Sequence, residues 1–323
     1  MSEPPPELVA DLRCPTCRAS FLLDGERLAC ENQHVFPVRR GIPRLAPRQE
    51  LDKERSRTAD AFGYSWSHYP LRNPYTESQW RDWVVPLTAA DFEHKVVLDA
   101  GCGLGGFAEY ARAWGARRVV GVDLSTAIDA ARDRLGDEVE LVQADIFSLP
   151  FGADTFDIAY SIGVLHHLPD PERGFRAMAA TVKPGGLVFA WVYGRENNGL
   201  IVAVIDPLRR HVFRRLPRAV LKWGVSLPLA MVLWPLVRLA RSGASFPYSA
   251  YFRFLAERDF AFTHGVVFDH LVAPTTHYIR RDEFEAWFRR AELVDVRVTW
   301  RNRNSWRGLG RVPEAGPARQ AGG

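Results

Sequence analysis

The stretch that most constrains the fold is residues 96–106, which read Val-Val-Leu-Asp-Ala-Gly-Cys-Gly-Leu-Gly-Gly. A short β-branched run leads into four glycines, and apolar residues at helical spacing continue to Trp114. This pattern predicts a strand, a tight turn and a helix. Glycine tolerates positive φ angles and lets a ligand approach the backbone, while the start of a helix offers unpaired N–H groups. We therefore expect a ligand site between this strand and this helix.

The same glycines satisfy the pattern Gly-x-Gly-x-x-Gly at Gly101, Gly103 and Gly106, so a dinucleotide site is one alternative. The polar residues that end the following strands bear on the choice. Alternating strand and helix patterns predict parallel strands at 96–98, 118–122, 139–143, 157–160 and 187–193, with a last helix at 281–291 and strand at 294–300. The fold class is thus α/β, with a largely parallel sheet and crossover helices.

In an open α/β sheet, ligands bind outside the carboxyl ends of the strands. Asp99, Asp123 and Asp145 stand at three of these ends, and Ser161 follows a fourth. A carboxylate at Asp123 can accept both hydroxyls of a ribose. Asp145 can accept from an adenine amino group, with the Ile146 N–H offered to a ring nitrogen. Asp99 stands where an ammonium group would be favourable.

Five motifs follow one another in register: 97–105 (Val-Leu-Asp-Ala-Gly-Cys-Gly-Leu-Gly), 121–125 (Gly-Val-Asp-Leu-Ser), 143–145 (Gln-Ala-Asp), 164–168 (Val-Leu-His-His-Leu) and 183–186 (Lys-Pro-Gly-Gly). Together they resemble the class I S-adenosylmethionine-dependent methyltransferases of the methyltransferase-11 type. The resemblance implies a Rossmann-like sheet of seven strands with helices on both faces. It also implies S-adenosylmethionine as cofactor, with the methionine end at Asp99 and the sulfonium beside Ser161. The contact set it implies is Asp99, Gly101, Cys102, Gly103, Gly105, Asp123, Leu124, Asp145, Ile146 and Ser161. A dinucleotide site requires neither Asp99 nor Asp145, whereas a cationic cofactor without phosphate suits a carboxylate-lined crevice.

Methyl transfer from a sulfonium is a displacement that needs alignment and exclusion of water, and it needs a base only if the acceptor keeps its proton. His166 and His167 are the nearest candidates in sequence, although this turn could serve only to shape the pocket. His264, His270 and His277 lie in the later insertion, from which one could enter the pocket. Tyr64 or Trp66 could close over a ligand, but packing over the sheet is the favoured interpretation.

Residues 12–47 form a separate unit with Cys14, Cys17, Cys30 and His34. Cys-x2-Cys followed by Cys-x3-His is a spacing at which two knuckles can present four ligands to zinc. So small a unit has little core, and zinc would supply its folding energy. The unit is similar to the zinc ribbons that are fused to, or partnered with, many methyltransferases, and a related spacing occurs in 23S rRNA guanine-N1 methyltransferases.

The insertion at 197–276, expected to form a helical lid, is both apolar and basic. Between residues 200 and 241 only Asp206 opposes the basic residues Arg209, Arg210, Arg214, Arg215, Arg218, Lys222, Arg238 and Arg241. Charges and two prolines make residues 219–240 a poor membrane span. A lid packed on the domain is the favoured interpretation, and peripheral contact with an anionic membrane is the alternative.

The organisation expected from these features is a disordered tail (1–11), a zinc ribbon (12–47), a helical linker and cover (48–95), the α/β domain with its lid (96–306) and a flexible tail (307–323). No signal segment opens the chain and four cysteines do not suggest a secreted disulfide framework, so we expect a cytoplasmic protein, with the lid as its candidate membrane contact. The predicted function is methyl transfer to a small-molecule or lipid-like acceptor. The alternatives are an RNA base methyltransferase, disfavoured because no Asn/Asp-Pro-Pro-Tyr motif follows the fourth strand, and a non-catalytic interaction protein.

Overall fold

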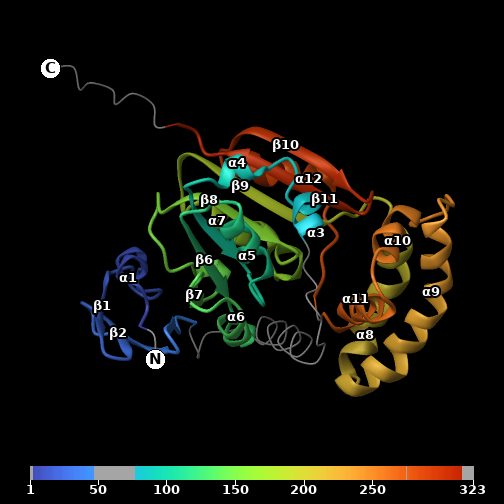
Figure 1. Cartoon of the computed structure of the whole chain (residues 1–323), viewed down its shortest axis with the longest axis horizontal. Coiled ribbons are helices and arrows are strands. Elements are labelled where there is room, and N and C mark those ends of the chain that lie inside the picture. Colours follow the sequence, from blue (N-terminus) through green and yellow to red (C-terminus); the bar gives the residue numbers. More distant parts are fainter. Residues whose placement is uncertain (1–2, 47–76, 274, 315–323) are drawn as a thin grey trace.

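The computed structural model describes residues 3–46, 77–273 and 275–314. Seven strands form the central sheet in the order β10-β11-β9-β8-β5-β6-β7 (Figure 1). They are β5 (Val96–Ala100), β6 (Arg118–Asp123), β7 (Glu140–Gln143), β8 (Phe156–Ile162), β9 (Val182–Tyr193), β10 (Val294–Arg301) and β11 (Ser305–Arg311). The first five pair in parallel, whereas β11 runs antiparallel to both β9 and β10. The predicted α/β sheet of seven strands is confirmed.

Alternate residues of the sheet pack against helices on opposite faces, because successive side chains of a strand point in opposite directions. Val96 and Leu98 face α7 (Pro171–Ala179) and α12 (Arg281–Arg290). Val97 faces the other layer. That layer consists of α3 (Glu77–Trp83), α4 (Ala89–Phe92), α5 (Gly106–Ala113) and α6 (Ala127–Leu135). Trp80 is fully buried there, with its ring centroid 5.5 Å from that of Tyr160.

Both predicted tails contain regular structure within the described residues. The expected tail from Arg307 was wrong over residues 307–311, which belong to β11 and pair with 187–191 of β9. The missing signal has a physical cause: Gly308 and Gly310 face the rings and side chains of Phe288 and Leu293, so packing demands small residues that read as loop. At the other end, α1 (Pro6–Asp11) is a helix with Leu8 buried. Residues 48–76 of the predicted helical linker and cover, which include Tyr64 and Trp66, lie outside the described residues.

The N-terminal unit lies beside the edge strand β7 (Figure 1). It contains a four-stranded antiparallel sheet of β1 (Phe21–Asp24), β2 (Arg27–Cys30), β3 (Val35–Arg39) and β4 (Ile42–Pro43). Leu45 N donates to Gln143 O at 2.8 Å, and Arg44 forms a parallel bridge with Gln143. The unit therefore covers one open edge of the main sheet.

The insertion is helical, as predicted. It forms a layer at the opposite end of the molecule from the N-terminal unit (Figure 1). Its elements are η3 (Ile201–Ile205), α8 (Asp206–His211), η4 (Phe213–Arg215), η5 (Val220–Ser226), α9 (Leu227–Arg241), α10 (Ser249–Ala256) and α11 (Phe260–Val272). Small apolar clusters hold these helices together, for example Val237 of α9 with Leu255 of α10. We call residues 197–276 the lid.

Candidate active site

A glycine turn connects β5 to α5, and its geometry explains why glycine is needed there. Gly101 has a φ of +89°, and a Cβ on it would lie 2.5 Å from the Val164 side chain. Gly105 has a φ of +74°, and a Cβ there would lie 2.3 Å from Leu135. Gly103 also has positive φ. Any larger residue at Gly101 or Gly105 would be strained in backbone and in packing. The turn therefore presents bare backbone at the end of the strand.

Asp123 at the end of β6 connects two loops of this crevice. One of its carboxylate oxygens accepts from Gly103 N at 2.9 Å. The other accepts from Ser125 N at 2.8 Å and Ser125 Oγ at 2.6 Å. Leu124 stands between Asp123 and Ser125 in the chain, and its carbonyl accepts from Gln143 Nε2 at 3.0 Å. A carboxylate held on two sides in this way has a defined orientation, which bidentate recognition of a diol requires.

Asp99 is the buried charge of the crevice. Its Oδ2 is buried and has no hydrogen-bond partner among the described residues. Burial is the main cause that raises the pKa of Asp99 to about 8, and the neighbouring Asp123 carboxylate contributes to this rise. A cation beside Asp99 would reverse that cost, so this orphaned oxygen fits a ligand that carries an ammonium or sulfonium group.

The remaining predicted contacts divide into two groups. Asp145 Oδ1 accepts from Phe147 N at 3.0 Å and so caps η1 (Ile146–Ser148), which places Asp145 and Ile146 at the end of β7. Ser161 and Cys102 are directed elsewhere. The Ser161 hydroxyl donates to Ala100 O at 2.7 Å inside the sheet, and the Cys102 side chain packs against Gly121. Their side chains therefore hold β5, β6 and β8 together.

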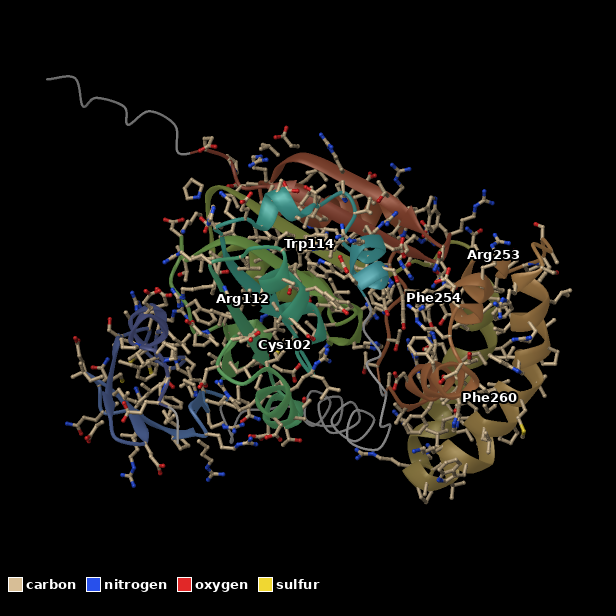
Figure 2. The ribbon with its side chains drawn as sticks, viewed as in Figure 1. Cys102, Arg112, Trp114, Arg253, Phe254 and Phe260 are labelled. Carbon is tan, nitrogen blue, oxygen red and sulfur yellow. The ribbon has the colours of Figure 1, made fainter. Side chains whose placement is uncertain are left out.

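A partly open cavity of about 190 Å³ lies between the sheet and the lid. Phe107 of α5 and Ile162 of β8 line it, so it adjoins the carboxyl ends of the strands. Much of its wall is aromatic, and the rings that line it are Trp83, Phe107, Trp191, Tyr193, Tyr251, Phe254, Phe262 and Tyr278. Figure 2 shows Phe254 of α10 on the side of the lid that faces α3 and the sheet. The cavity thus has one wall from the sheet layer and one from the lid.

The two histidines of η2 (Leu165–His167) have different surroundings. His167 lines the cavity, and its Nδ1 lies 2.9 Å from Thr275 O, an acceptor that assigns the proton to Nδ1. His166 does not line the cavity and is fully buried, with its ring 4.0 Å from that of Tyr193. Burial lowers the pKa of His167 to about 3 and that of His166 well below its usual value. Both rings are neutral at pH 7.

Sequence reasoning missed several polar residues of the cavity wall. Asp269, His270 and Tyr251 reach it from the lid, and Arg301 reaches it from the end of β10. Tyr251 Oη lies 3.3 Å from His270 Nε2. Of these, His270 was not missed, because it is one of the three histidines named as able to enter the pocket, and it does line the cavity. Nothing local marked Arg301, because its position depends on the antiparallel strands β10 and β11.

The four predicted metal ligands come together in the N-terminal unit. One ligand atom from each of Cys14, Cys17, Cys30 and His34 lies within 4.8 Å of the others. Cys30 Sγ is 3.4 Å and Cys14 Sγ 3.6 Å from His34 Nδ1, whereas Cys17 Sγ is 3.6 Å from Cys30 Sγ. Three thiols and an imidazole at this mutual spacing form a donor set that fits a tetrahedral zinc ion.

Part of the chain matches a known protein family. Residues 98–190 match the family Methyltransf_11, described as a methyltransferase domain. The chain is 35% identical over 146 residues to a ubiquinone biosynthesis O-methyltransferase of Thiobacillus denitrificans, covering 43% of this chain and 59% of that one. It is 32% identical over 153 residues to the enzyme of that name from Coxiella burnetii, covering 46% and 60%. The chain spans about 38 to 60% of the length of the first curated relatives it matches.

Among solved structures, the chain is similar to a possible histamine N-methyltransferase from Thermotoga maritima. The two are 13% identical with a TM-score of 0.49, over 78% of this chain and 99% of the other. The curated relatives match less than half of this chain. The cavity and its lid are therefore best understood from their own residues.

We expect one zinc ion per chain, and we expect Cys14→Ser to lose it because a three-ligand site binds zinc far more weakly. Elemental analysis of protein purified without chelator measures the stoichiometry. Cys102→Ser is the matched control, since Cys102 is a buried thiol outside the cluster. Zinc-free wild type, or full retention by Cys14→Ser, would contradict the assignment.

Asp99 makes a pH-dependent contribution to stability. Because its folded pKa lies above the unfolded value, the ligand-free protein should lose stability as pH rises from about 4 to 8. Asp99→Asn should remove this loss, so the variant should become more stable than the wild type, increasingly up to pH 8. Urea unfolding at several pH values measures the difference.

Asp157→Asn is the control of opposite sign. Although burial opposes it, hydrogen bonds from Val96 N and Lys183 hold the pKa of Asp157 below its usual range. This variant should be less stable than the wild type at neutral pH, and the deficit should shrink as pH falls through the carboxyl range. An Asp99→Asn variant no more stable than the wild type at pH 8 would count against the buried unpaired charge.

Proposed function

We propose, on the premise that residues 98–190 form a methyltransferase domain, that this protein transfers a methyl group from S-adenosylmethionine to a small aromatic or lipid-like acceptor. The observation that carries the proposal is the adjacency of two sites. The crevice at the strand ends offers a buried carboxylate to a cation, and an aromatic cavity adjoins it. The curated relatives named as ubiquinone biosynthesis O-methyltransferases support a small-molecule acceptor.

The residues of the crevice fit the cofactor. S-adenosylmethionine supplies a methyl group that its sulfonium already activates. Asp123 would bind the ribose, Asp145 with Ile146 the adenine, and Asp99 the cationic methionine end. The backbone of Gly101, Gly103 and Gly105 leaves room for close approach. The chain then has to align the acceptor and exclude water, and the lid serves both requirements.

We place His167, and not His166, beside the acceptor. Because its Nδ1 donates to Thr275 O, Nε2 carries the lone pair and can accept a hydrogen bond from a hydroxyl or amino group in the cavity. The low pKa of His167, caused mainly by burial, keeps the ring neutral and ready to accept. His166 lacks access to the cavity, so we assign it to packing under Tyr193.

The outer face of the lid supports contact with an anionic membrane. From Val220 to Arg241 one continuous helical run is long and apolar enough to cross a membrane by length and composition. Its exposed face carries Trp223, which is 57% exposed, and Val232, which is 69% exposed. No carboxylate interrupts the run. Exposed arginines precede it at residues 210, 214 and 215 and stand in its last turn at residues 238 and 241. This face lies on the outside of the molecule, away from the sheet (Figure 1).

We favour a helix lying on the membrane over a crossing helix, because its other side packs against α10 and α11. Apolar residues on the outer face favour lipid over RNA. RNA binding relies on basic residues that contact the phosphates and on aromatic side chains on which the bases stack. Trp223 is the interfacial anchor. Trp234 packs instead against Phe260, with ring centroids 5.5 Å apart.

The methyl-transfer proposal is tested with labelled S-adenosylmethionine and separate lipid, small-molecule and RNA fractions of a lysate. Label should enter a lipid or small-molecule product. Asp123→Ala should weaken S-adenosylhomocysteine binding about ten- to a hundredfold by calorimetry, because the diol loses a charged acceptor. Asp137→Ala removes an exposed surface carboxylate and should change neither readout. Cofactor binding without product in any fraction would favour a non-catalytic role, and a labelled RNA would favour the RNA alternative.

Membrane contact is tested by cosedimentation with phosphatidylglycerol vesicles. The wild type should bind, and binding should weaken between 0.1 and 0.5 M salt, over which the Debye length falls about twofold. Val232→Glu should abolish binding by placing a charge in the apolar face. Leu22→Glu makes the same change at a residue that is 76% exposed on the N-terminal unit and should bind normally. Absence of wild-type binding at low salt, or equal loss in both variants, would contradict the proposal.

A further inference from the structure

Arg301 is a buried cation in the wall of the cavity. It is the last residue of β10, is only 3% exposed and lines the cavity. Its guanidinium carbon lies 4.6 Å from the ring centroid of Trp83 and 4.7 Å from that of Phe254. The planar group is thus held between one ring from α3 and one from the lid, and both of these rings also line the cavity.

Part of this guanidinium is satisfied and part is not. Arg301 Nε donates to Asp82 Oδ2 at 2.7 Å, which fixes the plane of the group. Arg301 Nη2 is buried and has no hydrogen-bond partner among the described residues. A buried N–H of a charged group without an acceptor is costly, and such a donor on a cavity wall is a ready-made contact for an oxyanion.

The charge balance around Arg301 favours an anion. Asp82 is shared, because Arg307 Nη1 also lies 3.6 Å from its Oδ1 and donates to its carbonyl at 2.6 Å. Two guanidinium groups therefore face one carboxylate, and Asp82 is half exposed. Asp269 supplies the opposite charge on the lid wall, where it contributes to the raised pKa of Tyr251 together with the main cause, burial. An acceptor with an acid group at one end matches this division.

We propose that Arg301 binds the carboxylate of the acceptor, and that the acceptor is a planar aromatic acid held between the rings of the cavity. This inference rests on the proposed function of the same site. The cavity of about 190 Å³ is a little larger than the roughly 150 Å³ that holds a benzene ring. A single substituted ring with its carboxylate therefore fits the available space.

The competing explanation is that Arg301 only clamps α3 to β10 through Asp82. Two substitutions separate the explanations. Arg301→Gln removes both the clamp and the anion contact, whereas Asp82→Asn removes the charge of the clamp and leaves the cation. Under our proposal Asp82→Asn keeps or strengthens anion binding, because the competing carboxylate is gone. Arg303→Gln is the matched control, since Arg303 is an exposed arginine two residues away.

The experiment is calorimetric titration of the full-length protein, saturated with S-adenosylhomocysteine, with 4-hydroxybenzoate and with the neutral 4-hydroxybenzamide. The wild type should bind the acid at least about tenfold more tightly than the amide, in keeping with a charge-assisted pair. Arg301→Gln should reduce this preference to less than about threefold, whereas Asp82→Asn and Arg303→Gln should retain it. S-adenosylhomocysteine should bind all four proteins equally.

The outcomes distinguish this inference from the proposed function. Failure of the wild type to bind S-adenosylhomocysteine would overturn the proposed function. If the cofactor product binds, equal affinity for acid and amide, binding of neither, or an acid preference that survives Arg301→Gln would overturn the role of Arg301 alone. Loss of the preference in Asp82→Asn to the same extent as in Arg301→Gln would assign Arg301 to the clamp.

Discussion

Parallel pairing of β5 with β6 and β8 is the constraint on which the site depends. Parallel strands end at the same edge of the sheet, so the pairing of Asp99 with Gly121 and Tyr160 in register sets where each polar residue emerges. The interior strands are buried on both faces, and water cannot solvate a carboxylate at their ends. Asp99 therefore lies in an environment that favours a bound cation, while Asp123 is oriented by its own hydrogen bonds.

The lid covers the carboxyl ends of the strands and forms one wall of the cavity. The sheet contributes Trp191 and Tyr193, and the lid contributes Tyr251 and Phe254. Such rings exclude water and pack on planar molecules, which methyl transfer to an aromatic acceptor requires. Arg301 is held between rings of the two walls, so the position of its charge depends on how the lid packs.

The N-terminal unit is connected to the cofactor crevice through the edge strand. Arg44 Nη1 lies 3.2 Å from Gln143 Oε1, and Gln143 Nε2 donates to Leu124 O at 3.0 Å. Arg44 also pairs with Asp129 of α6. The unit therefore contacts β7, which pairs with β6, and α6, which follows the Asp123 loop. A unit with this set of four metal-binding side chains thus supports β7 at the edge of the sheet, next to the strand from which that loop emerges.

The sequence by itself determined the α/β class, the strands whose ends carry the carboxylates, the glycine turn and the four metal ligands. These features are local: β-branched runs, glycines with positive φ and short ligand spacings are encoded within a few residues of one another. Only the tertiary structure decided which histidine lines the cavity, that Ser161 bonds within the sheet, and that Arg301 reaches the pocket. The cavity residues depend on β11 entering the sheet between β9 and β10 and on the lid folding over its end, whereas the Ser161 bond depends on the pairing of β8 with β5. No local pattern encodes contacts between such distant segments.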